Sequence, residues 1–390
     1  MSESEVPSAE FALLCLAVLT LTIQCAVVLQ LIRGRLLITT LVEVPPVRQP
    51  SWPKVSVVIP ARNEERHLAL ALESVLQQDY ESLEVIVVDD RSDDGTPAII
   101  SRLEKEYPGL KVIRITDLPP GWLGKTHAMN TGAGAATGTY LLFADADVVM
   151  QPPALRFAIN YMLQNRLDHL VVGPQARPGS FLVNTMLVTF AINFLMVLQP
   201  WRAADPRSKK STGGGAFSLM KTEAYQTIGT MSALRLAVVD DLKLGSLIKA
   251  HGFQQEFVAG KGLIAIQWYC TVREMVGGLT KNVFAIFDFS LWKIARAFLG
   301  FAALNLWPLL AVFLTDDLTR TLNLILVFLQ TGLYVGGARY LRLSPICGLA
   351  FPIAQMIHAG ILLRSTIVTL KNGGVRWRGT FYSLSELKSS

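Results

Sequence analysis

The chain has 390 residues, of which 51% are hydrophobic and 17% charged, and its net charge is +6. Soluble domains carry roughly 25% charged residues, so this composition excludes an ordinary soluble protein and indicates a membrane protein. The basic residues form no stripe that would bind nucleic acid, and the four cysteines and five histidines show no metal-ligand or disulfide spacing.

The first predicted element is a membrane anchor within residues 1–44. Phe11–Ile32 is free of charged residues over about 22 positions, enough for a helix to cross a bilayer. A signal peptide is the alternative, but the preceding residues Glu3, Glu5 and Glu10 are acidic, and no small-residue cleavage site follows. We therefore expect an anchor that stays in the mature protein.

Residues 45–289 have globular composition and predict one α/β domain. The runs Lys54–Pro60 and Leu83–Asp90 are short and β-branched, as buried parallel strands are, and apolar residues at helical spacing lie between them. The pattern continues with a helix at Thr96–Glu106, a strand at Leu110–Ile115, a helix around Lys125–Ala136 and a strand in TYLLFAD. Alternating strands and helices predict a mostly parallel, Rossmann-like nucleotide-binding sheet covered on both faces.

Polar side chains follow the predicted strands, at the edge where parallel sheets bind ligands. Asp145 and Asp147 are separated by one residue at the end of an apolar run, so we expect both carboxylates on the same side. Such a pair suits Mg²⁺ or Mn²⁺, which prefer oxygen ligands and keep phosphate oxygens in their shell. Glu64, Asp89 and Asp90 follow neighbouring strands and predict a wall for a nucleotide. Lys125 at a helix start would meet a diphosphate.

A second group of candidate residues follows in the chain. Gly213, Gly214 and Gly215 run into a predicted strand, where glycines allow a sharp turn or a close approach to substrate. Asp240 and Asp241 begin an amphipathic helix, so helix capping is an alternative role. A carboxylate remote in sequence from the metal pair is nevertheless what a displacement reaction needs as a base.

The remaining apolar segments concern the membrane. Phe181–Pro200 is free of charge and long enough to cross, but a crossing would put the two aspartate pairs in different compartments. We expect a helix lying in the interface or buried beside the sheet. Residues 290–390 are predicted to form a C-terminal membrane region and a basic tail. The three spans there, each of roughly 18–21 residues, are Ala297–Thr315, Thr321–Ala338 and Leu343–Leu363.

Three crossings would leave the C-terminus outside the cell, whereas the basic flank KNGGVRWRG favours the cytoplasmic side. Leu343–Leu363 contains Pro345 and Pro352, so a re-entrant hairpin is our preferred interpretation, the alternative being an incomplete first span. His358 and Arg364 are candidates for lining an acceptor pocket, although snorkelling also accounts for the arginine.

Five ordered motifs, VVIPARNEE, VIVVDDRSDDGT, GKTHAMNTGAGAATGTYLLFADAD, TGGGAFSLMKTEAYQTIG and VVDDLKLG, resemble the family 2 glycosyltransferases with the GT-A fold. The match spans roughly Val55 to Ala285, and the stretches LPPGWLGK and GGVRWRGTFY are similar to hopanoid-associated, ceramide-glucosyltransferase-like and carotenoid glycosyltransferases. The resemblance implies that Pro60, Ala61 and Glu64 frame the nucleotide and that Asp90 or Asp89 reads the base. It also implies that Asp145 touches ribose or sugar, that Asp147 binds the metal, and that Asp241 is the general base.

One departure from the family's pattern bears on the product. Processive relatives carry QxxRW, whereas this sequence reads QWYCTVREM from Gln267, with Trp268 next on the presumed acceptor side. We therefore expect transfer of one sugar from a UDP- or GDP-sugar to a hydroxyl of a membrane lipid, in the inner membrane with the catalytic domain in the cytoplasm. The alternatives are a polyprenyl-phosphate sugar synthase, a polysaccharide synthase and, remotely, a non-catalytic scaffold.

Overall fold

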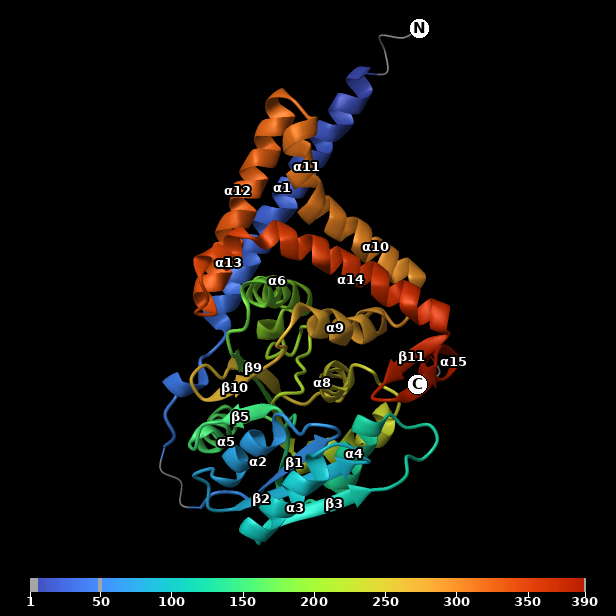
Figure 1. Ribbon diagram of the computed structural model, residues 1–390. Coiled ribbons are helices and arrows are strands. Elements are labelled where there is room, and N and C mark those ends of the chain that lie inside the picture. The colour runs from blue at the N-terminus through green and yellow to red at the C-terminus, as the bar shows by residue number, and fades with distance from the viewer. Residues whose placement is uncertain (1–5, 48–50, 389–390) are drawn as a thin grey trace. The chain divides into compact units, whose positions relative to one another are not determined.

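The computed structural model describes residues 6–47 and 51–388, so the first five residues of the predicted anchor lie outside the described part (Figure 1). The chain forms two compact units. The helical unit comprises Met1–Arg35, Pro178–Val197 and Tyr269–Val375, and the sheet unit comprises Leu36–Arg177, Leu198–Trp268 and Arg376–Ser390. This division differs from the contiguous domain 45–289, because two segments inside that range group with the membrane helices and the C-terminal tail groups with the sheet.

The sheet unit is built on a seven-stranded sheet with the order β3-β2-β1-β4-β8-β6-β9. Its strands are β1 (Val55–Ala61), β2 (Leu83–Asp90), β3 (Leu110–Ile115), β4 (Tyr140–Phe143), β6 (His169–Gly173), β8 (Ser218–Lys221) and β9 (Gln255–Ala259). Every pairing is parallel except those of β8, which runs antiparallel to both β4 and β6. The prediction of a mostly parallel α/β sheet is confirmed.

Helices of the sheet unit connect these strands. They are α2 (Leu68–Leu76), α3 (Thr96–Glu106), α4 (Gly124–Gly134), α5 (Ala154–Asn165), α7 (Thr222–Thr227) and α8 (Asp240–Ala250). The predicted helix Thr96–Glu106 and the predicted strands Leu83–Asp90 and Leu110–Ile115 are observed with the same bounds. These segments carry strong local patterns, so the sequence places them without tertiary information.

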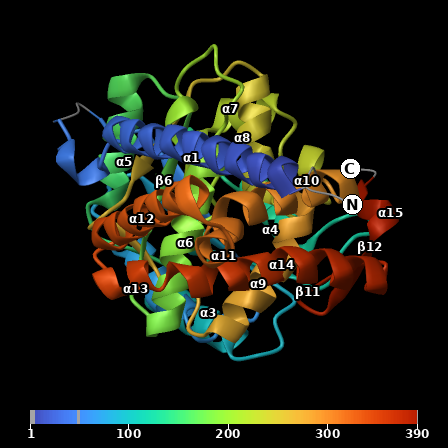
Figure 2. The ribbon, with the colours of Figure 1, turned by 90° about the horizontal axis from the view of Figure 1, so that it is seen from above.

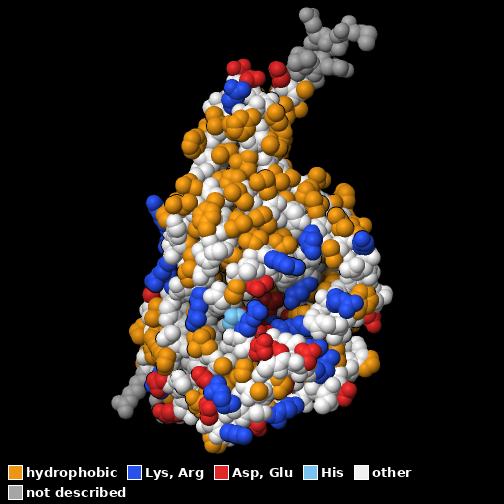
Figure 3. All heavy atoms as spheres, viewed as in Figure 1, with side chains coloured by type: hydrophobic (Ala, Val, Ile, Leu, Met, Phe, Trp, Pro, Cys, Tyr) orange, Lys and Arg blue, Asp and Glu red, His pale blue; other side chains and the backbone are white. Residues whose placement is uncertain are grey.

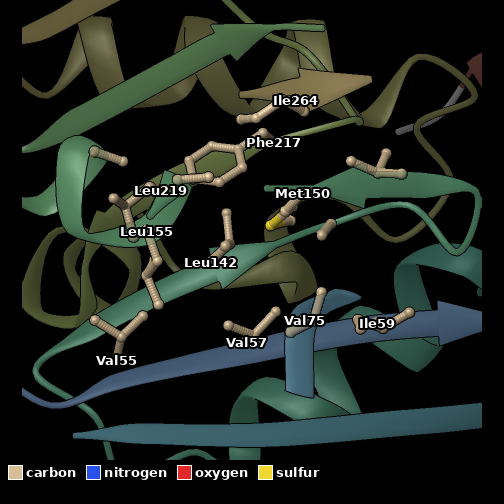
Figure 4. Close-up of a cluster of buried hydrophobic side chains, with 14 of the residues drawn as sticks. Val55, Val57, Ile59, Val75, Leu142, Met150, Leu155, Phe217, Leu219 and Ile264 are labelled. Atoms are coloured by element: carbon tan, nitrogen blue, oxygen red, sulfur yellow. The ribbon is translucent and has the colours of Figure 1, made fainter. Parts of the chain in front are cut away.

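The core lies on both faces of the sheet, as the β-branched strands require. Val57, Ile59 and Leu142 point to one face, where they meet Leu155 and Phe217 (Figure 4). Their neighbours in the strands point to the other face and pack with helix α4, namely Val58, Ile86, Val88, Leu141 and Phe143 with Ala128 and Met129. Because alternate residues point to opposite faces, a strand buried on both sides must be apolar throughout.

A small three-stranded sheet lies next to the DAD segment. Its strands, in order, are β5 (Val148–Met150), β10 (Ile264–Ile266) and β7 (Gln175–Ala176). In the antiparallel pair of β5 and β10, Val148 is the partner of Ile266. Asp147 precedes Val148 and Gln267 follows Ile266, so the two lie at the same end of this ladder. The pairing therefore joins the DAD segment to the segment that begins QWYC.

The helical unit contains α1 (Val6–Leu37), α6 (Phe181–Leu198), α9 (Val272–Ile286), α10 (Leu291–Phe301), α11 (Trp307–Leu314), α12 (Asp317–Tyr340), α13 (Pro345–Leu349) and α14 (Phe351–Asn372) (Figure 2). Within residues 6–47 and 51–388, five helical segments are long and apolar enough to cross a membrane: Ala9–Leu37, Phe181–Arg202, Leu291–Leu314, Asp317–Tyr340 and Phe351–Asn372. Large apolar side chains such as Phe313 (81% exposed) and Phe328 (73%) point outward, and hydrophobic side chains cover these helices in Figure 3. Exposed apolar surface of this extent indicates contact with lipid.

Helix α6 cannot cross the membrane once, although it is long enough. Strands β4 and β6 precede it in the chain and β8 follows it, and β8 is hydrogen-bonded to both of those strands. A single crossing would place the partners of one sheet on opposite sides of the bilayer. Whether α6 lies in the interface or is buried by other protein stays a prediction.

The same reasoning limits the C-terminal crossings. The chain leaves the sheet unit after Trp268 and belongs to it again from Arg376. The number of crossings between these residues must therefore be even, so the three predicted spans cannot all cross. The segment Leu343–Leu363 consists of α13 and the start of α14, separated at Ala350.

Helices α9 and α10 are separate elements, although their sequence between residues 281 and 296 is continuously amphipathic. Asp288 and Phe289, between the two helices, have φ angles of 51° and 53°. Two successive residues in the left-handed region cannot continue a right-handed helix.

Candidate active site

Asp145 and Asp147 lie in a tight turn between β4 and β5. The strand ends at Phe143, two residues earlier than the predicted TYLLFAD strand, and the Val148 amide donates to the Asp145 carbonyl at 3.2 Å. The alternation expected of a strand nevertheless continues, because Ala144 and Ala146 are buried while both aspartates are partly exposed. Two carboxylates are thus presented to the solvent side of the turn.

The electrostatics of this pair favour a bound cation. Burial raises the pKa of Asp147 to about 7, and repulsion first from Asp145 and then from Glu64 adds to the effect. A divalent cation would relieve this repulsion. The described residues contain no group of three or more His, Cys, Asp or Glu side chains that could hold a metal. A metal at Asp145 and Asp147 would therefore take further oxygens from a ligand such as a diphosphate, which is how Mg²⁺ is commonly held.

Lys125 joins this pair to the second acidic pair. Its Nζ atom lies 2.8 Å from Asp145 Oδ1 and 3.6 Å from Asp240 Oδ2. Burial lowers the pKa of Lys125, but Asp145 and Asp240 outweigh that effect and raise it above its ordinary value. Lys125 therefore stays positively charged between two acidic pairs that are about 95 residues apart in sequence. Its charge reduces the repulsion between the carboxylates of the two pairs.

Asp240 and Asp241 begin α8, as predicted, but their surroundings differ. The Asp240 side chain is almost fully buried, its Oδ2 atom accepts no hydrogen bond from the described residues, and burial raises its pKa to about 6. Asp241 is partly exposed and held by backbone amides: Leu242 donates to Oδ1 at 2.8 Å and Gly215 donates to Oδ2 at 3.1 Å. Burial raises the pKa of Asp241 as well. Asp241 is thus the member of the pair that a substrate can reach.

The glycine triplet passes through the middle of the site. A Cβ atom added at Gly215 would lie 2.7 Å from Asp145 Oδ2 and 3.2 Å from Lys125 Nζ. A Cβ added at Gly213 would overlap the Asp241 backbone carbonyl, and one at Gly214 would lie 2.9 Å from Val171 Cγ1. Close approach of the backbone to both acidic pairs therefore requires residues without side chains here.

The carboxyl end of β2 provides a third acidic group. Ser92 donates its amide to Asp89 Oδ1 at 3.2 Å, and the Arg91 Nε atom lies 2.7 Å from Asp90 Oδ1. Arg62 adds a second cation 3.6 Å from Asp90 Oδ2. The neighbouring end of β1 holds Pro60 and the buried Ala61, whose pairing partner is Asp89. Sequence reasoning missed Arg62 and Arg91, although Arg91 directly follows a predicted strand and Arg62 lies two residues beyond another.

Glu64 lies beyond β1 and contacts two distant segments. Its amide donates to Thr96 Oγ1 at 2.8 Å, and its carboxylate forms an ion pair with Arg378 in the C-terminal tail. Tyr382 in the same tail accepts a hydrogen bond from the Gly124 amide at 3.3 Å. The sequence prediction assigned no role to Arg378 or Tyr382, although both lie in the stretch GGVRWRGTFY.

The remaining candidates, Gln267 and Trp268, are half-buried at the end of β10. Trp268 packs against the core of the sheet unit, which gives it a structural function in addition to any contact with substrate. The strand pairing brings Gln267 to the end of the ladder where Asp147 lies.

A mostly parallel sheet with a DxD turn after its fourth strand and a second acidic pair joined to it by Lys125 defines a GT-A-type glycosyltransferase. The sequence model of the glycosyl transferase family 2 matches residues 56–229. The match assigns this segment to glycosyl transferase family 2, and the resemblance seen in the five motifs is confirmed.

Two curated relatives and one solved structure extend the comparison. The 4,4'-diaponeurosporenoate glycosyltransferase of Staphylococcus aureus (strain bovine RF122 / ET3-1) is 26% identical over 353 residues, covering 85% of this chain and 89% of its own length. The same enzyme of strain USA300 is 25% identical over 345 residues with the same coverage. The mannosyltransferase PcManGT from Pyrobaculum calidifontis, solved with GDP-Man and Mn²⁺, has a TM-score of 0.59 at 19% identity and covers 92% of this chain and 99% of its own. At this identity the structure shows the shared fold alone.

Proposed function

We propose that the protein transfers a single sugar from a nucleotide-sugar donor to a hydroxyl of a membrane lipid, with inversion at the anomeric carbon. The observation that carries this proposal is the position of Lys125, which is 2.8 Å from Asp145 and 3.6 Å from Asp240. This position supports a donor site and a general base that act within one site, as a single displacement requires.

Each acidic group has its own part in this reaction. Asp145 and Asp147 would hold Mg²⁺ or Mn²⁺, which would supply charge neutralisation for the departing diphosphate. Pro60, Ala61, Glu64, Asp89 and Asp90 would frame the nucleoside. Lys125 would provide a positive charge near the diphosphate as negative charge develops on it.

Asp241 is the proposed general base. It removes the proton from the acceptor hydroxyl, whose oxygen attacks the anomeric carbon while the bond to the diphosphate breaks. The two backbone amides that hold Asp241 fix its direction, and its raised pKa makes it a better proton acceptor than an ordinary aspartate. Gly213, Gly214 and Gly215 leave room for the acceptor beside it, with Asp240, Gln267 and Trp268 on the same side.

An apolar acceptor is supported by two observations. The described part of the chain contains five helical segments that are apolar enough to cross a membrane, which would bring the protein and a lipid substrate into one phase. The curated relatives are named for 4,4'-diaponeurosporenoate, a carotenoid acid. A hopanoid, sphingolipid, glycerolipid or carotenoid acceptor fits the same reasoning.

The sheet unit is proposed to face the cytoplasm, where nucleotide sugars are made, with the protein in the inner membrane. In that orientation α1 crosses once, and the even number of crossings after Trp268 returns the tail to the cytoplasm. The basic residues of KNGGVRWRG then lie inside, as the positive-inside rule favours.

The proposal is tested with purified protein in lipid nanodiscs and a panel of UDP- and GDP-sugars. We expect nucleotide release from one donor that requires Mn²⁺ or Mg²⁺ and a lipid extract, and that EDTA abolishes. A glycolipid product retained in the organic phase completes the assignment. Nucleotide binding without release from any donor, with metal and lipid present, would contradict the proposal and favour a non-catalytic role.

A further inference from the structure

The C-terminal tail brings two polar side chains to the nucleotide edge of the sheet. Strand β11 (Gly374–Trp377) pairs with β12 (Thr380–Ser383), and the turn between them contains Arg378 and Gly379 with φ angles of 45° and 84°. From Arg376 onward the tail belongs to the sheet unit. The turn residue Arg378 reaches Glu64, which is 314 positions earlier in the chain.

Tyr382 fixes the tail beside helix α4. Its side chain is buried, and its hydroxyl accepts the Gly124 amide at 3.3 Å. A Cβ added at Gly124 would overlap Asp90 and lie 2.9 Å from Arg91 Nη2. The tail, the start of α4 and the end of β2 therefore meet at one place, next to the residues proposed to frame the nucleoside.

The Arg378 ion pair contributes little to stability. The Arg378 side chain is 42% exposed, and water screens the attraction between exposed charges. The ion pair therefore matters mainly for the electrostatic balance of the site. Five carboxylates gather at this edge (Glu64, Asp89, Asp90, Asp145 and Asp147), and a nucleotide sugar brings two more negative charges in its diphosphate.

The cations described so far do not neutralise every carboxylate at this edge. Arg62 and Arg91 pair with Asp90, Lys125 pairs with Asp145, and the proposed metal serves Asp145 and Asp147. Arg378 is the cation at Glu64. Without it an approaching diphosphate would meet an uncompensated carboxylate.

We infer that the tail is a wall of the donor site and that Arg378 binds the nucleoside diphosphate of the donor. This inference rests on the proposed function. In the free enzyme the guanidinium neutralises Glu64, and when the donor binds it keeps this ion pair while its remaining N–H groups donate to the phosphate oxygens. Tyr382 holds the tail in place, so the donor site is complete only when the chain's last segment is docked.

The inference is tested on the full-length protein in nanodiscs, with UDP and GDP as probes in the presence of Mn²⁺. Arg378→Ala should weaken binding of the nucleotide that the wild type prefers by about tenfold, the loss of one charge-assisted contact. It should raise the donor KM by a similar factor and leave kcat within about twofold. Arg378→Lys should restore part of the affinity.

Arg376→Ala is the matched control, because Arg376 is an exposed arginine of the same hairpin. It should bind nucleotide as the wild type does. Bound nucleotide should also slow tryptic cleavage after Arg378 in the wild type and leave it unchanged in Tyr382→Phe, whose tail is less firmly docked. If Arg378→Ala binds nucleotide as tightly as Arg376→Ala, the inference is wrong while the proposed function stands. If the wild type binds neither nucleotide, both are wrong.

Discussion

The two aspartate pairs, Asp145 with Asp147 and Asp240 with Asp241, consist of the same residue type and lie on either side of Lys125. The first pair is separated by one residue in a turn between strands, so both carboxylates face the same way and repel each other. The second pair is consecutive at a helix start, so one carboxylate is buried and the other is fixed by backbone amides.

This difference shows how local backbone geometry gives one residue type two functions. Alternation in the turn produces a pair that a metal can bridge, whereas adjacency at a helix start produces one reachable base and one buried partner. Environments that separate the properties of similar acids are typical of sites that need both a metal ligand and a proton acceptor.

Asp147→Asn is expected to have the largest effect, because it removes the metal-binding function of the first pair. This substitution keeps the size of the side chain and removes one of the two charges that would hold the metal. We expect turnover to fall by about 10³-fold, the several kcal/mol that a metal contributes to transition-state stabilisation. Nucleotide release and Mn²⁺ titration measure the effect.

Asp79→Asn is the control for this substitution, since the Asp79 side chain is 63% exposed and pairs with Arg156, which is not part of the site. It should leave both turnover and metal affinity unchanged. Metal-dependent turnover by Asp147→Asn at the wild-type rate would show that the metal is held elsewhere.

Asp241→Asn tests the proposed function of the second pair, general-base catalysis. Removing the base should lower kcat by about 10²–10³-fold while nucleotide binding stays within about twofold, because the asparagine keeps the shape of the site. Single-turnover kinetics and equilibrium nucleotide binding separate the two effects. A matched loss of nucleotide affinity would indicate that Asp241 belongs to the donor site instead of acting as the base.

Lys125→Met removes the positive charge that lies between the two aspartate pairs. The methionine fills similar volume without charge and leaves Asp145 and Asp240 uncompensated. We expect the free energy of unfolding to fall by about 2 kcal/mol, less than for a fully buried pair because the lysine is a quarter exposed. Thermal unfolding in detergent measures the change, and Lys105→Met, an exposed lysine on α3, should unfold like the wild type.

The smallest expected effect is a pH dependence of metal stabilisation. The folded-state pKa of Asp147 is raised to about 7 from an ordinary value near 4. In metal-free protein this group therefore lowers stability as pH rises from about 4 to about 7, since the folded state binds more protons there. The metal binds the deprotonated form, so Mn²⁺ should raise the unfolding temperature more at pH 8 than at pH 5.5. An equal shift at both values, or the same pH dependence in Asp147→Asn, would contradict this assignment.

The sequence by itself determined the elements with strong local patterns. Strands β2 and β3 and helices α3 and α8 follow from runs of apolar residues and their spacing, and the polar clusters after the strands located most of the site. The position of Asp145 and Asp147 after an apolar run was sufficient to predict an exposed acidic pair.

Only the tertiary structure decided which distant residues meet. Arg378 lies beside Glu64 and Lys125 joins Asp145 to Asp240 because the sheet order and the return of the tail bring them together, and no local pattern records such contacts. The pairing of β8 with β4 and β6 likewise argues against a single crossing by α6, although its composition alone allows one. Apolar periodicity reports the burial of a segment, whereas its partners depend on long-range pairing that only the folded chain establishes.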